Sequence, residues 1–283
     1  MRRVFHGSSF PAAAAVLAAV LLCTICGRVS GQALSRDRIE ERLEAGQDAY
    51  RRAVELDRTD PAAAKDYYRK AILNFESIAE EGGIDNGRLY YNIGNAWFRL
   101  GDLGHAILNY RRAMLYTPGD PNLLQNLEFA RSRRISRIEP GQSEKVFKTL
   151  FFLHYDVPAR VRAMIFASAF VLLWALASLH IFHRRHWVRI AIGAAAAVSV
   201  LTAVSLAVER ISLRRSPPGV VVAGEVTARK GDAETYQPTF TEPLHAGTEF
   251  ELVEKRGDWW YIELEDGVRC WITAASGELV IEG

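Results

Sequence analysis

The feature that most constrains this chain is the order of small and large residues between positions 90 and 118. Gly94 and Ala106 are small, as is required where two antiparallel helices approach closely. Three aromatic residues are placed to fill the space around them: Tyr90, Trp97 and Tyr110. A Gly-Asp pair at 101–102 interrupts the helical pattern, and Pro118 ends the second helix. The segment is therefore predicted to form a helix–turn–helix unit, with Trp97 buried between its helices.

The same residues fall at the positions that characterise a tetratricopeptide repeat (TPR), a helix pair with a period of about 34 residues. The matching residues are Tyr90, Ile93, Gly94, Trp97, Ala106, Tyr110, Ala113 and Pro118. Such repeats build a scaffold and contain no chemistry of their own. The resemblance therefore implies that this region binds peptides or proteins.

A second, weaker copy of the unit precedes the first. Residues 70–75 (Lys-Ala-Ile-Leu-Asn-Phe) match residues 105–110 (His-Ala-Ile-Leu-Asn-Tyr) at an offset of 35 positions. Its first helix is expected over residues 39–56, and a polar-faced capping helix over residues 121–133. Residues 34–137 are thus predicted to form an all-α TPR solenoid, with an unrelated helical bundle as the alternative.

Residues 1–33 have the composition of a signal peptide that directs export. Arg2 and Arg3 form a basic start, an apolar core follows over residues 11–25, and Gly-Gln-Ala at 31–33 is a small-residue cleavage site. Cys23 and Cys26 lie in or beside this apolar core and are interpreted as part of the signal peptide rather than as a redox pair. Cleavage would leave Cys270 as the only thiol, so no internal disulfide is expected.

Two uncharged apolar stretches, residues 163–182 and 190–208, are each long enough to cross a bilayer. A basic loop over residues 183–189 joins them. Before them, residues 145–157 alternate charged and large apolar side chains, which predicts a helix that lies in the membrane interface. Small residues at four-residue spacing on the second stretch favour close helix packing; they are Gly193, Ala197, Ser199, Ala203 and Ala207.

Export followed by two crossings predicts that both soluble regions lie outside the cytoplasm and that the basic loop lies inside it. The distribution of positive charge by itself does not decide the orientation, because arginines flank the apolar stretches on both sides.

Residues 216–283, called the tail below, carry 13 acidic and 5 basic residues and are predicted to be all-β. Short runs bounded by turn residues predict strands over 220–223, 248–253, 259–264 and 269–273. The turn residues and tryptophans resemble those of the bacterial SH3-like domain, a small five-stranded barrel; they are Ala228, Arg229, Gly231, Leu244, Gly247, Thr248, Gly257, Asp258, Trp259, Asp266, Gly267 and Trp271. Cys270 stands where that family usually has a glycine, which leaves open whether another backbone approaches closely there.

The order of these parts is more specific than any one of them. A signal peptide, TPR repeats, a two-helix membrane hairpin and an SH3-like tail resemble the BatE-type proteins of bacterial aerotolerance (Bat) operons. The motif that carries the resemblance best is Tyr-Asn-Ile-Gly-Asn-Ala-Trp at 91–97, followed by Ala-Ile-Leu-Asn-Tyr at 106–110. Relatives are encoded beside MoxR-type ATPases and von Willebrand factor A-type membrane proteins. The resemblance therefore implies a scaffold of that assembly in the bacterial inner membrane, with both soluble regions on the periplasmic side.

No group of residues predicts an enzyme, a metal site or a cofactor site. The carboxylate pairs at 40–41 and 80–81 are interpreted as solvated helix surface, and His180, His183 and His186 as anchors at the membrane turn. No phosphate-binding loop or basic patch with interleaved aromatics is present, which argues against nucleic acid as a partner. The expected function is a non-enzymatic adaptor; alternatives are a sensor that binds peptidoglycan peptides, and an unrecognised wall hydrolase.

The expected protein-binding groove lies on the first helix of the repeat and continues on the capping helix. Its seven predicted residues are Tyr91, Asn95, Phe98, Arg99, Gln125, Asn126 and Arg133. Asparagine and arginine side chains hold peptide backbones and carboxylates, and the aromatic residues supply apolar contact. The carboxylate clamp of other TPR proteins has a lysine where Tyr91 stands, so an acidic chain terminus is only one possible ligand. The alternative is that these residues are ordinary solvated helix surface.

Overall fold

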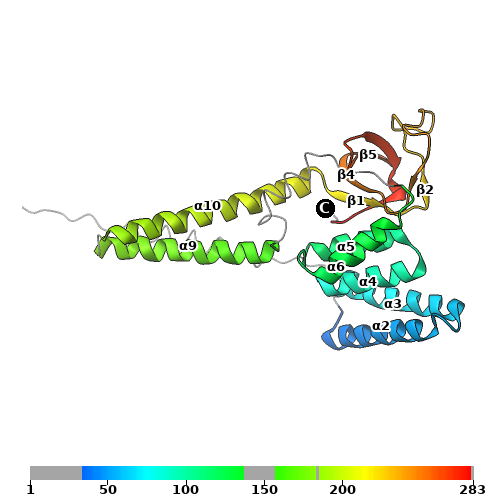
Figure 1. The fold of residues 1–283 in the computed structure, drawn as a ribbon, viewed down its shortest axis with the longest axis horizontal. Helices are drawn as coiled ribbons and strands as arrows, with labels where there is room; N and C mark the ends of the chain where they lie inside the picture. Colours follow the sequence, from blue (N-terminus) through cyan, green and yellow to red (C-terminus); the bar gives the residue numbers. More distant parts are fainter. Residues whose placement is uncertain (1–33, 137–156, 183–184, 282–283) are drawn as a thin grey trace, which may run out of the picture.

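The computed structural model describes residues 34–136, 157–182 and 185–281 (Figure 1). The predicted signal peptide at 1–33 lies outside these residues, as does nearly all of the predicted interfacial helix at 145–157. The described chain forms a helical array, a pair of long apolar helices and a β-rich tail.

Five helices form the array, and local sequence explains where each one begins. They are α2 (Arg36–Leu56), α3 (Pro61–Glu80), α4 (Gly87–Leu100), α5 (Leu103–Met114) and α6 (Pro121–Ser132). Each is preceded by a serine, aspartate or asparagine whose side chain accepts from a backbone N–H of the first turn. Gly101 ends α4 with φ of 85°, a conformation that glycine adopts without strain.

The small residues of the array mark the places where its helices meet. A Cβ atom at Gly94 would lie 2.7 Å from Cδ1 of Tyr110, and one at Gly46 would lie 2.6 Å from Cε1 of Phe75. Tyr110 and Phe75 are both fully buried. Each glycine thus makes room for an aromatic ring of the next helix, as predicted for Gly94.

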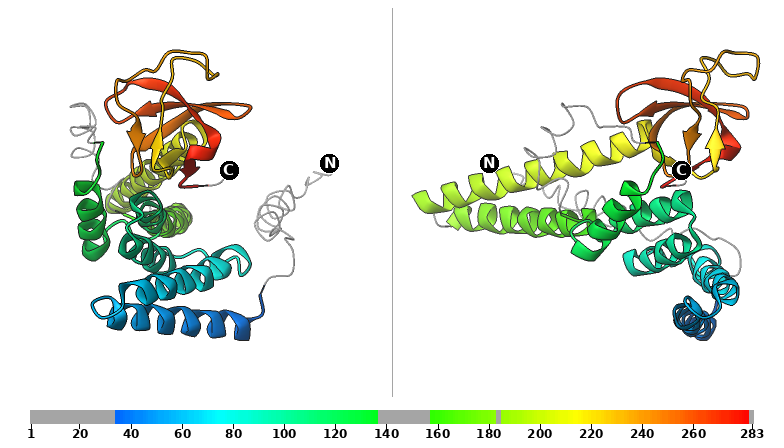
Figure 2. Two further views of the ribbon diagram at one scale, coloured as in Figure 1. Left: turned by 90° about the vertical axis from the view of Figure 1, so that its right-hand side faces the viewer. Right: turned by 45° about the vertical axis from the view of Figure 1, so that its right-hand side comes forward.

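Two long helices, α9 (Ala159–Phe182) and α10 (His186–Arg215), pack side by side and project away from the array and tail (Figures 1 and 2). Their segments Ala159–Ile181 and His186–Val208 are long and apolar enough to cross a membrane. The predicted loop over 183–189 is longer than the observed one, because α10 already begins at His186. Nothing from His186 to Arg189 is a glycine or proline, so the helix continues through these residues.

The small residues of α10 separate onto two sides of the helix. Ser199 is buried together with Ala195, whereas Gly193 and Ala197 are exposed and a Cβ atom at Gly193 would meet open space. Near the start of α9, the guanidinium of Arg162 donates a hydrogen bond of 2.7 Å to the hydroxyl of Ser205 on α10. Only part of the predicted small-residue stripe therefore lies in the helix contact.

The tail contains a five-stranded antiparallel sheet in the order β6-β5-β4-β1-β7 and a two-stranded sheet, β2-β3. The elements are β1 (Pro218–Val221), β2 (Glu225–Val226), β3 (Leu244–His245), β4 (Glu249–Arg256), β5 (Trp259–Leu264), β6 (Arg269–Thr273), the 3₁₀ turn η1 (Ala274–Ser276) and β7 (Gly277–Leu279). Predicted strands coincide with β1, β4, β5 and β6. The other three strands have two or three residues each, too few to show an alternating pattern.

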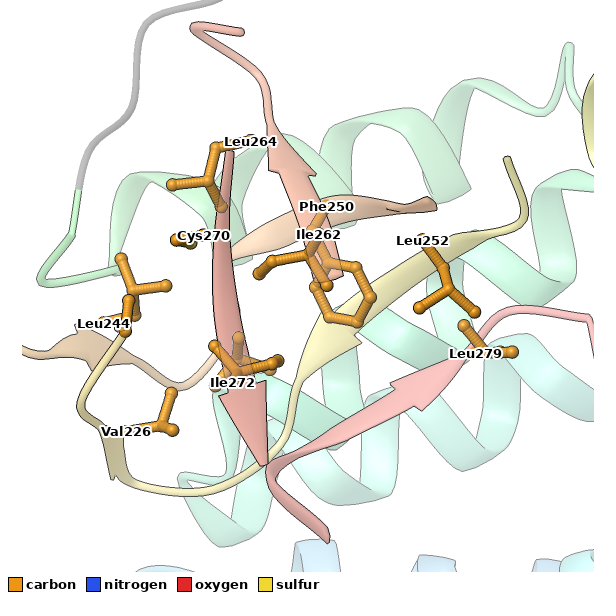
Figure 3. Close-up of a cluster of buried hydrophobic side chains, with 11 residues drawn as sticks. Val226, Leu244, Phe250, Leu252, Ile262, Leu264, Cys270, Ile272 and Leu279 are labelled. Carbon is orange, nitrogen blue, oxygen red and sulfur yellow. The ribbon is translucent and has the colours of Figure 1, made fainter. Parts of the chain in front are cut away.

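The core of the tail is apolar and includes Cys270 (Figure 3). Ile262 on β5 pairs with Cys270 on β6, and both side chains are buried beside Phe250. The core therefore has room for a side chain at this position, and no glycine is needed. Burial raises the pKa of the Cys270 thiol to about 12, which keeps it protonated and unreactive.

The tail packs directly on the helical array (Figures 1 and 2). Val220 and Val280 of the tail share one buried apolar cluster with Ile107 and Leu108 of α5. At Gly104 the backbones come close, since a Cβ atom there would lie 2.8 Å from Cα of Val222. The tail therefore covers the apolar outer surface of α5, a contact that the sequence analysis did not predict.

Candidate protein-binding surface

Three of the predicted groove residues meet in one hydrogen-bonded cluster between α4, α5 and α6. The hydroxyl of Tyr110 donates to Oδ1 of Asn95 at 2.8 Å. The amide nitrogen Nδ2 of Asn126 donates to the Tyr91 hydroxyl at 2.9 Å and to Asn95 Oδ1 at 3.0 Å. The cluster fixes the side chains of α4 relative to those of α6.

The hydrogen bonds of the cluster also determine which amide atoms of Asn95 and Asn126 remain available to a ligand. Both N–H groups of Asn126 are used within it, and so is the carbonyl oxygen of Asn95. Among the described residues, the NH₂ group of Asn95 and the carbonyl oxygen of Asn126 have no hydrogen-bond partner. A donor on α4 and an acceptor on α6 match the acceptor and donor of a peptide group.

An apolar contact lies beside this polar cluster. The rings of Phe98 on α4 and Phe129 on α6 lie 5.6 Å apart between centroids. Phe129 is 48% exposed, and the guanidinium of Arg133 lies 4.9 Å from its ring centroid. We call the side chains of Tyr91, Asn95, Phe98, Asn126, Phe129 and Arg133 the α4–α6 surface.

The remaining two predicted residues, Arg99 and Gln125, lie outside the α4–α6 surface. Arg99 reaches toward α2, where its guanidinium is 3.4 Å from the carboxylate of Asp57, and this pair is largely exposed. Burial raises the pKa of the Tyr50 hydroxyl on α2, and the neighbouring Arg99 partly opposes that shift. Gln125 is exposed and makes no hydrogen bond with the described residues.

Sequence reasoning missed Phe129 and the Tyr110 hydroxyl. Phe129 follows Asn126 by three positions and precedes Arg133 by four, which places all three on one side of a helix. Helical spacing alone was therefore sufficient to place Phe129 on the same surface as Asn126 and Arg133. The Tyr110 hydroxyl gave no such signal, because the residue was assigned to the core by its ring alone.

Trp97 is not buried as predicted. It is partly exposed, its ring stacks on His105 at 4.5 Å between centroids, and its indole N–H donates to Glu76 at 3.3 Å. Tyr110 instead packs near Tyr91, at 6.1 Å between ring centroids. The indole N–H requires an acceptor, which Glu76 provides at the edge of the helix pair rather than in its centre.

His105 connects this edge to the tail. Its Nδ1 lies 2.8 Å from the carboxylate of Asp102, and its Nε2 lies 3.6 Å from the carboxylate of Glu278 on β7. These two carboxylates raise the pKa of His105 to about 9. His105 is therefore a cation at neutral pH, and it contributes to the contact between the array and the tail.

A second ionic contact between array and tail centres on Glu249 of β4. Arg131 of α6 donates two hydrogen bonds to its carboxylate, 2.7 Å from Nε to Oε1 and 2.8 Å from Nη2 to Oε2. Arg111 and Arg134 each lie 3.4 Å from the same carboxylate. Burial favours the protonated form of Glu249, but the three arginines outweigh it and hold the pKa of this carboxyl below its usual range.

Metal chemistry has no evident site in the part of the chain that the structure describes. No group of three or more histidine, cysteine, aspartate or glutamate side chains there is arranged to hold a metal ion. His180, His183 and His186 were not predicted as ligands, and His183 lies outside the described residues.

A family model of the tetratricopeptide repeat matches residues 87–120. The match covers α4, α5 and the turn that leads to α6. No curated protein and no solved structure matches the chain. The chain therefore contains a TPR repeat, an element that generally mediates contacts between proteins.

Proposed function

We propose that this chain is a non-enzymatic, membrane-anchored adaptor that binds an extended segment of a partner protein on the α4–α6 surface. The observation that supports this most directly is that, within the described part of the chain, the Asn95 NH₂ group and the Asn126 carbonyl oxygen have no hydrogen-bond partner. The hydrogen-bonded cluster holds both amides in place before a ligand arrives. Binding therefore costs little side-chain conformational entropy.

Each part of the α4–α6 surface has a role in this proposal. The Asn95 NH₂ group donates to a backbone carbonyl of the partner, and the Asn126 carbonyl accepts a backbone N–H. Phe98 and Phe129 receive an apolar side chain of the same segment. Arg133, and Arg99 further along α4, attract a carboxylate of the partner, either a side chain or a chain terminus.

The membrane anchor is the helix pair α9 and α10, which we propose to cross the bilayer twice. The array and the tail lie before and after this pair, and the buried core that they share supports placing both on one side. Arg160 in the first turn of α9 lies 5.7 Å from the ring centroid of Tyr116, which places the array next to the start of that helix. With the export signal predicted at 1–33, that side is the periplasm of a bacterial inner membrane.

The proposed setting is an assembly of the Bat type. The order of parts resembles BatE-type proteins, which implies von Willebrand factor A-type membrane proteins and a MoxR-type ATPase as neighbours. The five-stranded antiparallel sheet with its buried apolar core supports assigning the tail to the SH3-like domains. Its contact with α5 and α6 supports a tail that acts together with the array rather than as a separate module.

The proposal is tested by capturing partners on the tagged full-length protein from crosslinked native membranes. Asn95→Ala combined with Asn126→Ala should abolish partner recovery while the protein keeps its normal level in the membrane. Asn74→Ala is the matched control, because this amide lies on α3, away from the α4–α6 surface. Equal recovery from the double variant and the control would place partner binding elsewhere.

A second candidate function is binding of peptidoglycan peptides by the tail. The observation that favours it is the stacked pair Tyr261 and Trp271, 4.9 Å apart between ring centroids, with the guanidinium of Arg256 over Trp271 at 4.8 Å. Aromatic rings and a cation suit a ligand with both apolar and carboxylate groups. Sedimentation of the purified protein with isolated sacculi tests it, and a Tyr261→Ala variant that sediments equally well would contradict this role of the aromatic pair.

A further inference from the structure

The last helix of the array, α6, has two functional sides. Asn126, Phe129 and Arg133 belong to the α4–α6 surface. Arg131 and Arg134 extend to the tail instead. Since successive residues of a helix are about 100° apart, Arg131 lies roughly 200° from both Phe129 and Arg133. The helix therefore presents one side to the proposed partner and nearly the opposite side to the tail.

The tail holds the C-terminal half of α6 through Glu249. Its carboxylate is 7% exposed and receives both hydrogen bonds of the Arg131 guanidinium. Arg134 donates to the same carboxylate at 3.4 Å and to the backbone carbonyl of Gly247 at 3.2 Å. A buried carboxylate with a two-bond arginine contact has a defined geometry, so the contact fixes position as well as charge.

The turn before β4 is itself seated on the array. Gly247 has φ of 88°, and a Cβ atom there would lie 2.8 Å from Cδ1 of Ile107 on α5. Two residues before Gly247, Nδ1 of His245 lies 2.9 Å from the hydroxyl of Ser136, a residue that follows the end of α6. Residues 245–249 of the tail therefore contact α5, the end of α6 and the residues that follow it.

Within the described array, the backbone of α6 lies close to one helix, α5, because α6 is the last helix of the stack. It meets α4 through side chains, Asn126 with Asn95 and Phe129 with Phe98. An inner helix such as α4 packs against α3 on one side and α5 on the other. The tail packs its backbone on α5 and reaches α6 through the side-chain contacts of Arg131 and Arg134. Phe129 and Arg133 lie at the same end of α6 as the contact with Glu249.

We propose that Glu249 is a positioning residue for the α4–α6 surface: through Arg131 and Arg134 it holds α6 where Asn126, Phe129 and Arg133 face α4. The inference rests on the proposed function for the existence of a partner. It goes beyond that function by assigning the tail a role in partner binding without contact to the partner. Because such coupling is reciprocal, a bound partner also tightens the attachment of the tail to the array.

Glu249→Gln in the full-length protein tests the proposal, since it removes the charge and keeps the size. Hydrogen exchange of the backbone amides reports how often α6 opens locally, and it needs no partner. Exchange in α6 should become at least tenfold faster, while α2 and α3 keep their protection. Partner recovery from crosslinked membranes should fall at least fivefold. Glu254→Gln is the control, because Glu254 lies on the same strand and contacts Arg256 of the tail.

Unchanged exchange in α6 would overturn the proposal, and so would an equal rise in all helices, which would make Glu249 a support of the whole fold. Adding Arg131→Gln to Glu249→Gln should cause no further loss of α6 protection, because both residues act through one contact. Additive effects would contradict this. The exchange data are independent of the proposed function, which fails separately if Asn95→Ala with Asn126→Ala leaves partner recovery intact.

Discussion

The guanidinium of Arg131 and the carboxylate of Glu249 form two parallel hydrogen bonds, of 2.7 and 2.8 Å, although the residues are 118 positions apart in the sequence. Both apolar helices, α9 and α10, lie between them in the chain. Residues joined by direct hydrogen bonds share one side of any membrane that these helices cross. The contact therefore requires an even number of crossings between α6 and β4.

This relationship leads to a prediction for topology. Alkaline phosphatase, which is active only after export, should be active when fused after Gly283 and inactive when fused at Arg185, in the turn between α9 and α10. The expected orientation follows from the signal peptide predicted at 1–33. Activity of both fusions would show that the hairpin does not cross the bilayer, and the reverse pattern would place the array and the tail in the cytoplasm.

Close packing of the tail on α5 should make Gly104 intolerant of any side chain. Gly104→Ala places a methyl group 2.8 Å from Cα of Val222, so the backbones must separate. We expect a loss of about 1–3 kcal/mol in the free energy of unfolding, as for other overpacked contacts. Urea denaturation followed by tryptophan fluorescence measures it. Gly224→Ala is the control, since a Cβ atom there meets open space, and equal losses in the two variants would contradict the described contact.

The partial exposure of Trp97 lowers the expected cost of its removal. Trp97→Ala should cost about 2 kcal/mol, less than the roughly 3–5 kcal/mol typical of fully buried aromatic residues. Phe75→Ala should show that full cost, because Phe75 is 1% exposed. The two variants are compared by denaturation of the full-length protein. A Trp97→Ala variant at least as unstable as Phe75→Ala would mean that Trp97 lies in the centre of the helix pair after all.

His105 should make the stability of the protein sensitive to alkaline pH. Asp102 and Glu278 raise its pKa to about 9, above the value of about 6.5 expected for an unfolded chain. A group with a raised pKa stabilises the fold fully below the unfolded pKa, and the contribution is lost as the pH rises through the folded pKa. The melting temperature of the native protein should therefore fall more between pH 7 and pH 10 than that of His105→Gln. Parallel pH profiles would argue against the described ion contacts.

Much of the helical architecture could be predicted because it depends on local patterns. Gly94 and Ala106 marked the closest helix approach, and the lengths of the apolar stretches gave α9 and α10. The docking of the tail could not be predicted in the same way. Ile107 and Leu108 are apolar whether α5 faces another repeat, the tail or a partner, so the sequence does not distinguish the three.

The candidate site shows the same limit. Helical spacing predicted that Tyr91 and Asn95 share one face that Asn126 continues on the capping helix, and the structure joins the three by hydrogen bonds. The role of His105 was missed, because its partner Glu278 is 173 positions away and lies on a three-residue strand. Glu249 was likewise one of many acidic residues of the tail until the structure placed three arginines around it.

The central claim is that the α4–α6 surface binds a partner protein, and photo-crosslinking from Phe129 tests it most directly. A photoreactive phenylalanine analogue at position 129 should capture a protein partner in native membranes, and Asn95→Ala with Asn126→Ala should abolish that product. The same analogue at Leu73, which is 67% exposed on α3, should capture none. Equal capture from positions 73 and 129, or capture at 129 that persists in the double variant, would contradict the account.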